Sequence, residues 1–186
     1  MAQELHAFLD AGGDLRGTDI LQYVFALNDS AIVERVLKNG VEPFELDRAL
    51  VRVAETGNPD NVRLLLSYGA DPDARNVLDD GKRRSTTSLD ASGDHKYTTT
   101  KTPLVMACYQ AHSTMEEKIT IVRTLIEKGV NASSEENNKA LCCALGRRQT
   151  QLAQILMDAG ADGTTDRAIC AAVEYPESVR LLLHRC

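Results

Sequence analysis

Apolar residues recur three and four positions apart in several short segments of this chain, and most of these segments end at a glycine. The clearest segment, residues 58–71, reads NPDNVRLLLSYGAD. This spacing predicts an amphipathic helix, and the glycine suits a left-handed helix C-cap. Similar segments stand at residues 5–14, 32–40, 121–131, 152–162 and 175–183. Such self-similarity is typical of a solenoid, so we expect an all-α array of helical repeats.

The repeated segments divide the chain into units that we expect to form one domain, residues 1–186. An N-terminal half-unit, about residues 1–14, holds a single helix, and each later unit pairs a first helix with a second. The expected helices are 20–27 with 31–39, 46–55 with 60–68, 103–111 with 115–128, 139–145 with 151–159, and 167–174 with 177–185. The corresponding units are about residues 15–42, 43–71, 102–131, 132–162 and 163–186.

Two helix starts carry specific signals. Asn58 is a good N-cap residue, and Pro59 stands where the first helical turn tolerates proline. Residues 114–117 read TMEE, a capping-box pattern that should start a helix one turn before Ile119.

An insertion of about residues 72–101 separates the third unit from the fourth. It is polar and too poor in apolar residues to fold alone, which leaves two interpretations: a long β-finger with a mobile tip, or a disordered loop. Its sequence KRRST predicts either a kinase site at Ser85 or Thr86 or a solvated polar tip. Residues 71–101 hold six acidic and six basic side chains, a balance that favours protein over nucleic-acid recognition.

The Gly-Ala-Asp exits at 69–71 and 160–162, together with KTPLVMAC at 101–108, resemble ankyrin repeats. The resemblance covers roughly residues 3–186. Spacings between the repeat-closing glycines are 28, 29, 60 and 31 residues, where the family period is about 33. The short spacings leave no room for the family's hairpins outside the insertion, and Val105 replaces the family's histidine in the one unit with Thr-Pro-Leu.

This resemblance implies a concave, protein-binding surface built from the first helices and the connections. Tyr109 and Arg147 are of the residue types most often found as interface hot spots. The alternative interpretation is that Arg147 and Arg148 are solvated loop residues. The matching positions are Glu55, Thr56, Tyr109, Gln110 and Arg147, with Arg52 one turn before Glu55 and with Arg83, Arg84 and Tyr97 on the inserted finger.

Catalytic signatures are missing from the sequence: there is no HExxH, GxxxxGK[ST] or GxGxxG pattern. Cys108 and His112 are four apart, a spacing that a metal site could use, but no CxxC motif supplies further ligands. We therefore expect Cys108 to be a structural cysteine, and neighbouring Cys142 and Cys143 to point to different faces of a helix. The sequence predicts no enzyme, no cofactor and no metal site.

Charge and composition limit the partners. The net charge of −6 argues against a nucleic-acid partner. No run approaches 18 apolar residues, so we expect no membrane span.

Five cysteines without a secretion signal favour free thiols in the cytoplasm, with the nucleus as the alternative. Apolar residues 181–183 close the array without an evident polar cap. Two interpretations follow: one leucine points outward and the end frays, or a further repeat, a neighbouring domain or a second copy covers it.

The sequence therefore predicts a non-catalytic protein-recognition module: a scaffold, adaptor or inhibitor that binds a partner through the concave helix face and the finger. The alternative is a targeting domain of a larger enzyme or effector whose catalytic part lies outside these residues. A third interpretation is a thiol redox or metal site around Cys108 and Cys142.

Overall fold

The computed structural model describes residues 4, 7–8, 10–13, 21, 24–25, 30–75, 101–109 and 113–184. These residues form nine helices and no strand. The helices are α3 (Ser30–Lys38), α4 (Pro43–Thr56), α5 (Pro59–Ser67), α6 (Pro103–Tyr109), α7 (Met115–Glu127), α8 (Glu135–Gly146), α9 (Thr150–Asp158), α10 (Asp166–Ala172) and α11 (Pro176–Leu183).

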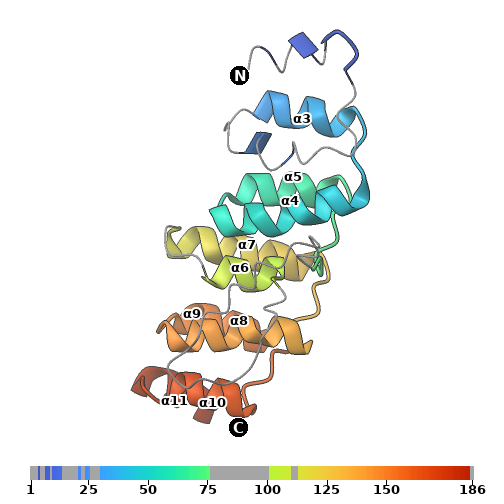
Figure 1. The fold of residues 1–186 in the computed structure, drawn as a ribbon. Helices are drawn as coiled ribbons and strands as arrows, with labels where there is room; N and C mark the ends of the chain where they lie inside the picture. Colours follow the sequence, from blue (N-terminus) through green and yellow to red (C-terminus); the bar gives the residue numbers. More distant parts are fainter. Residues whose placement is uncertain are drawn as a thin grey trace, which may run out of the picture.

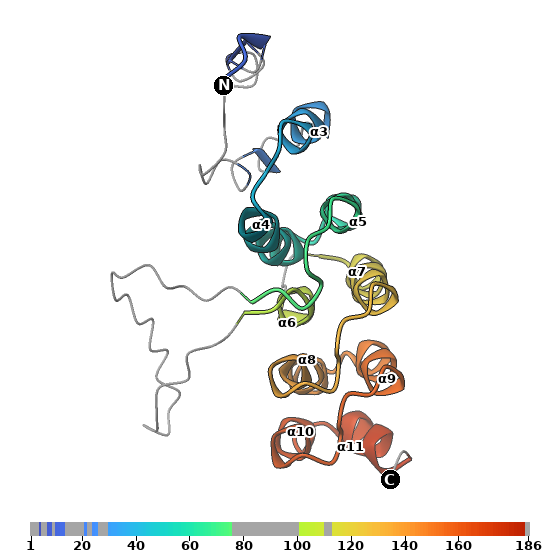
Figure 2. The same cartoon turned by 90° about the vertical axis from the view of Figure 1, so that its right-hand side faces the viewer.

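The helices from α4 onward stack in pairs along one axis (Figure 1). Seen from the side, α4, α6, α8 and α10 form one layer, and α5, α7, α9 and α11 form the other (Figure 2). Within the first layer, α4 packs against α6, α6 against α8, and α8 against α10. The expected all-α repeat solenoid is confirmed.

The core is a continuous strip that runs along the array between the two layers. Leucines from each layer are fully buried in it, among them Leu50, Leu65, Leu104, Leu125 and Leu141. Burying one such side chain stabilises the fold by about 1.5–3 kcal/mol. Buried alanines on the first helices, such as Ala107 and Ala140, leave room for close helix packing. The chain therefore needs few aromatic residues.

Both predicted helix starts are confirmed. The Asn58 Oδ1 accepts hydrogen bonds from the backbone N–H groups of Asp60 and Asn61, at 3.1 and 3.2 Å, with Pro59 in the first turn of α5. Thr114 and Glu117 form the capping box of α7, with Glu117 N–H 3.3 Å from Thr114 Oγ1.

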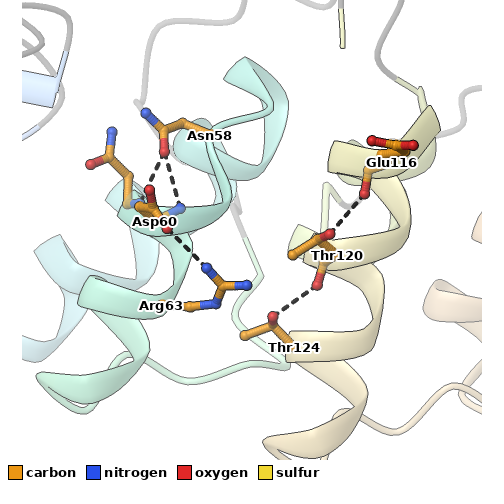
Figure 3. Close-up of polar contacts among 7 residues, drawn as sticks. Asn58, Asp60, Arg63, Glu116, Thr120 and Thr124 are labelled. Atoms are coloured by element: carbon orange, nitrogen blue, oxygen red, sulfur yellow. Dashed lines mark hydrogen bonds and ion pairs between the residues drawn. The ribbon is translucent and has the colours of Figure 1, made fainter. Parts of the chain in front are cut away.

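The helices α5 and α7 lie side by side in the second layer, and their polar side chains bond within their own helix (Figure 3). Arg63 pairs with Asp60 at 2.9 Å on α5. On α7 the Thr120 hydroxyl donates to the Glu116 carbonyl, and the Thr124 hydroxyl donates to the Thr120 carbonyl, both at 2.8 Å. A threonine can thus be buried between two helices because its hydroxyl is satisfied by its own backbone.

Two first helices begin earlier than the apolar pattern predicts. Helix α4 begins at Pro43 rather than Leu46, and α8 begins at Glu135 rather than Lys139. The added turn of α8 is polar, and the helix is capped by Ser134, whose Oγ accepts from Asn137 N–H at 3.2 Å. A hydrophobic period cannot detect a turn whose buried residues, Asn137 and Asn138, are polar.

The helices α5, α7 and α9 end with one shared geometry. After α5, Gly69 N–H donates to the Leu66 carbonyl and Ala70 N–H to the Leu65 carbonyl, which is the Schellman pattern. Gly69, Gly129 and Gly160 all occupy the left-handed region, with φ values of 93°, 92° and 101°. The glycines that the sequence singles out at these three helix ends are therefore C-cap residues, as predicted.

None of the described helices is both long enough and apolar enough to cross a membrane.

Candidate functional site

Tyr109 and Arg147 lie against each other at the C-terminal ends of α6 and α8. The Arg147 guanidinium lies over the Tyr109 ring, 4.5 Å from its centroid, and Arg147 Nη1 donates to the Tyr109 backbone carbonyl at 2.7 Å. The last carbonyls of a helix have no partner within the helix, so this arginine satisfies one of them across the unit boundary. Tyr109 remains 60% exposed. The two predicted hot-spot residues thus form one exposed stacked pair.

A second cation lies close to this pair. Lys118 of α7 is buried, and its pKa is lowered first by desolvation and then by the nearby positive charge of Arg147. Burial raises the pKa of the nearby Cys143 thiol, although the charges of Arg147 and Lys118 act in the opposite direction. Lys118 and Arg147 therefore lie near each other, with Arg147 over the Tyr109 ring.

Arg148 extends the same edge toward the last unit. Its side chain is 63% exposed, lies 5.8 Å from the Tyr175 ring centroid, and places Nη2 3.8 Å from Oε1 of Glu177. Its backbone has φ 60°, the left-handed region, which costs a residue with a Cβ about 1–2 kcal/mol. Arg147 and Arg148 are both exposed, and each one also lies near an aromatic ring of a neighbouring unit.

The three predicted residues of α4 make local contacts. Arg52 Nη1 lies 3.4 Å from Oε2 of Glu55, which confirms that the two side chains share a face. The Thr56 hydroxyl donates to the Val53 carbonyl at 2.9 Å and so satisfies the end of the helix. An exposed ion pair of this kind adds little stability, so Arg52 and Glu55 can exchange partners at little cost.

A groove between α8 and α10, with a volume of about 330 Å³, lies on the first-helix layer. Its charged lining residues were not predicted from the sequence. Glu135, Lys139 and Cys142 line it from α8, and Arg167 lines it from α10. The charge of Arg167 lowers the pKa of Cys142, but burial is the larger cause and raises it. The spacing of residues 135, 139 and 142, which places them on one helix face, is the signal that could have found this groove.

The start of the insertion is fixed to α8. Asp73 accepts hydrogen bonds from Asn131 N–H and from Asn137 Nδ2, the latter at 2.7 Å. Arg75 Nη1 lies 3.0 Å from Oε1 of Glu136. These contacts place residue 75 beside the N-terminal turn of α8, which also borders the groove.

Several predicted residues lie outside the described part of the chain. They are Arg83, Arg84 and Tyr97 on the insertion, the two candidate phosphorylation positions Ser85 and Thr86, and Gln110 and His112 after α6.

The described cysteines differ in burial, from buried Cys108 to exposed Cys170. Cys108 is fully buried, and burial raises the pKa of its thiol, which keeps it protonated and unreactive near neutral pH. Cys142 faces the groove, whereas Cys143 lies near the charges of Arg147 and Lys118, so the two neighbours point to different sides as expected. Among the described residues, no group of three or more His, Cys, Asp or Glu side chains has an arrangement that could hold a metal ion.

Helix pairs stacked in two layers around one continuous core define an all-α helical-repeat solenoid. Residues 49–77, which include most of α4 and all of α5, match the family model described as ankyrin repeat. This match supports assignment of the chain to the ankyrin repeat family, whose members generally act as protein-binding modules. A comparison with curated proteins found no match.

Proposed function

We propose that this chain is a non-catalytic recognition module, acting as a scaffold, adaptor or inhibitor, that binds a protein partner on the exposed face of α4, α6 and α8. The Tyr109–Arg147 pair carries the proposal. Its ring and guanidinium are exposed, yet they are held in one geometry by the stack and by the 2.7 Å hydrogen bond. Tyr and Arg in such fixed positions are the side chains that most often dominate interface energies.

The rigidity of the array supports this role. The helices that present Tyr109, Arg147 and Arg52 share a continuous core, so little backbone entropy is lost when a partner binds. The Arg52–Glu55 pair and the α8–α10 groove would extend the contact surface on either side. Lys139 and Arg167 offer charged groups in the groove, and Glu135 offers one of opposite sign.

The inserted finger is the second part of the proposed surface. Arg75 and Asp73 hold its start next to α8. We include Arg83, Arg84 and Tyr97 of the finger in the proposed contact surface for the same partner. Cys108, Cys142, Cys143 and Cys170 are free thiols, a state that suits the reducing cytoplasm or nucleus, where we place this activity.

The experiment that tests the proposal is affinity capture from a lysate of the source cell, followed by calorimetry with the purified captured protein. The double variant Tyr109→Ala, Arg147→Ala should bind more than about tenfold more weakly, because it removes two hot-spot side chains. Arg123→Ala is the matched control, since Arg123 is an exposed arginine on α7 in the other layer.

A modest loss of thermal stability is expected in the double variant, because Arg147 also bonds to the Tyr109 carbonyl. Binding is therefore compared at a temperature where both proteins are folded by circular dichroism. Equal affinity of the double variant and the wild type would reject this face as the binding surface.

A further inference from the structure

Arg148 occupies a backbone position that the ends of α5, α7 and α9 give to glycine. After α8, Arg148 N–H donates to the Leu145 carbonyl at 3.2 Å and Gln149 N–H donates to the Ala144 carbonyl at 2.9 Å. This is the same Schellman pattern that Gly69, Gly129 and Gly160 complete after α5, α7 and α9. Among the described residues, Arg148 is the one non-glycine residue with positive φ. A strained residue at an exposed position points to a role that glycine cannot fill.

The two arginines point to different units from adjacent positions. Arg147 lies over Tyr109 of the preceding unit and Arg148 lies near Tyr175 of the following one, at 4.5 and 5.8 Å from the ring centroids. An aromatic ring covers one face of a guanidinium and leaves N–H groups at its edges for other acceptors. The stacking therefore orients both groups without using their donors, although Arg147 Nη1 already donates to the Tyr109 carbonyl.

We infer, building on the proposed protein-binding function, that Arg147 and Arg148 form a site for the carboxylates of an acidic segment on the protein partner. A guanidinium presents parallel N–H donors that match the two oxygens of a carboxylate. Two such groups on consecutive residues would engage two acidic side chains of one extended segment.

The surrounding charges favour this class of partner. Lys118 lies close enough to Arg147 for the two charges to repel each other, and an added carboxylate would relieve that repulsion. Glu177 already lies 3.8 Å from Arg148, at the outer limit of an ion pair, and both side chains are more than half exposed. Glu177 therefore shows that a carboxylate can lie near the Arg148 guanidinium, and it would compete with the partner's carboxylate for Arg148.

The test uses the full chain and a short fluorescein-labelled polyglutamate peptide, with polyglutamine and polylysine peptides of the same length as controls. Fluorescence anisotropy should show binding of polyglutamate that weakens as salt rises, and weaker binding of both controls. Arg148→Gly should lower the affinity at least about fivefold while the melting temperature stays the same or rises, because glycine relieves the left-handed strain. Glu177→Gln should raise the affinity about twofold, since it removes the internal competitor.

Arg148→Lys is the conservative variant: it keeps the charge and removes the fork of donors, so its affinity should lie between those of the wild type and Arg148→Gly. A structural role for Arg148 predicts the opposite of the proposal, namely a lower melting temperature in Arg148→Gly with unchanged peptide binding. That result would overturn the inference, as would equal binding of polyglutamate and polyglutamine. Tighter binding of a labelled oligouridylate than of polyglutamate would overturn it in favour of RNA.

The outcome separates this inference from the proposed function. Arg148 is outside the pair whose loss tests the protein-binding face. If the captured partner depends on Tyr109 and Arg147 but binds the Arg148→Gly variant normally, the recognition module stands and the acidic-segment site fails. If no partner depends on Tyr109 and Arg147, the proposed function fails whatever the peptide shows.

Discussion

Asn138 holds the backbone of Asp162 by two hydrogen bonds. Its Oδ1 accepts from Asp162 N–H at 2.8 Å, and its Nδ2 donates to the Asp162 carbonyl at 3.0 Å. The first helix of this unit is thereby tied to the loop that leaves its second helix. In the α4–α5 unit Asp47 takes the same place, and its Oδ1 accepts from Asp71 N–H at 2.8 Å. An aspartate accepts there but, when ionised, has no proton to donate.

Replacing Asn138 by alanine should lower the free energy of unfolding by about 2 kcal/mol, since two hydrogen bonds at a largely buried site are lost. Urea denaturation followed by circular dichroism measures the change. Asn138→Asp keeps the acceptor and loses the donor, so its stability should lie between the two. An alanine variant as stable as the wild type would show that the loop holds itself in place through its own turn.

Replacing Asp47 by asparagine should raise stability near neutral pH by about 1 kcal/mol, the typical net value of the hydrogen bond that the new amide can donate to Asp71. Desolvation, the largest cause, raises the pKa of Asp47 above its ordinary value of 3.8, the charge of Asp71 adds to this, and the hydrogen bond from Asp71 opposes it.

The raised pKa fixes the sign of the pH dependence. An acid whose pKa is higher in the folded state loses stability as pH rises from its unfolded to its folded pKa. The advantage of Asp47→Asn should therefore be largest above the raised pKa and should shrink as pH falls toward 3.8. Unfolding curves at several pH values check this. An advantage that is constant with pH would show that the charge of Asp47 carries no penalty.

The thiols should differ sharply in reactivity. Cys170 is exposed and should be alkylated by iodoacetamide in the native protein, whereas Cys108 should react only after denaturation. Burial both excludes the reagent and raises the pKa of the Cys108 thiol, so the reactive thiolate is scarce at neutral pH. Peptide mass spectrometry after timed labelling assigns each site. Rapid labelling of Cys108 in the native protein would mean that α6 opens readily, and it would support a thiol-based function.

Self-association through the C-terminal helix stays a prediction, and we extend it here to the last helix pair, α10 and α11. Ile169 and Val173 of this pair are 49% and 68% exposed, and Leu183 is 70% exposed, whereas Leu182 is buried. If these side chains bind a second copy, sedimentation equilibrium should show a dimer whose population rises with concentration, and Val173→Glu should abolish it by placing a charge in the contact. The control is Glu174→Ala, an exposed change at the adjacent position. A wild-type chain that stays monomeric at high concentration would exclude this mode.

The sequence alone predicted the repeat architecture because burial of an apolar helix face depends on spacing along the chain. Leu65 and Leu125 were placed correctly by their period, and the Asn58 and Thr114 caps by their local chemistry. It missed the polar first turn of α8, since Asn137 and Asn138 are buried through hydrogen bonds to residues 73 and 162, which no local pattern encodes.

The features of the candidate site were likewise partly predicted from the sequence and partly decided by the tertiary structure. Residue type and repeat position identified Tyr109 and Arg147 separately, and the spacing of Arg52 and Glu55 predicted their shared face. Tertiary structure alone decided that Arg147 lies over Tyr109, that Arg148 faces Tyr175, and that α8 and α10 enclose a groove. These contacts join residues on different units, and their geometry depends on how consecutive units stack. Helix formation is governed by local period, whereas the relation between units is set by packing across the whole array.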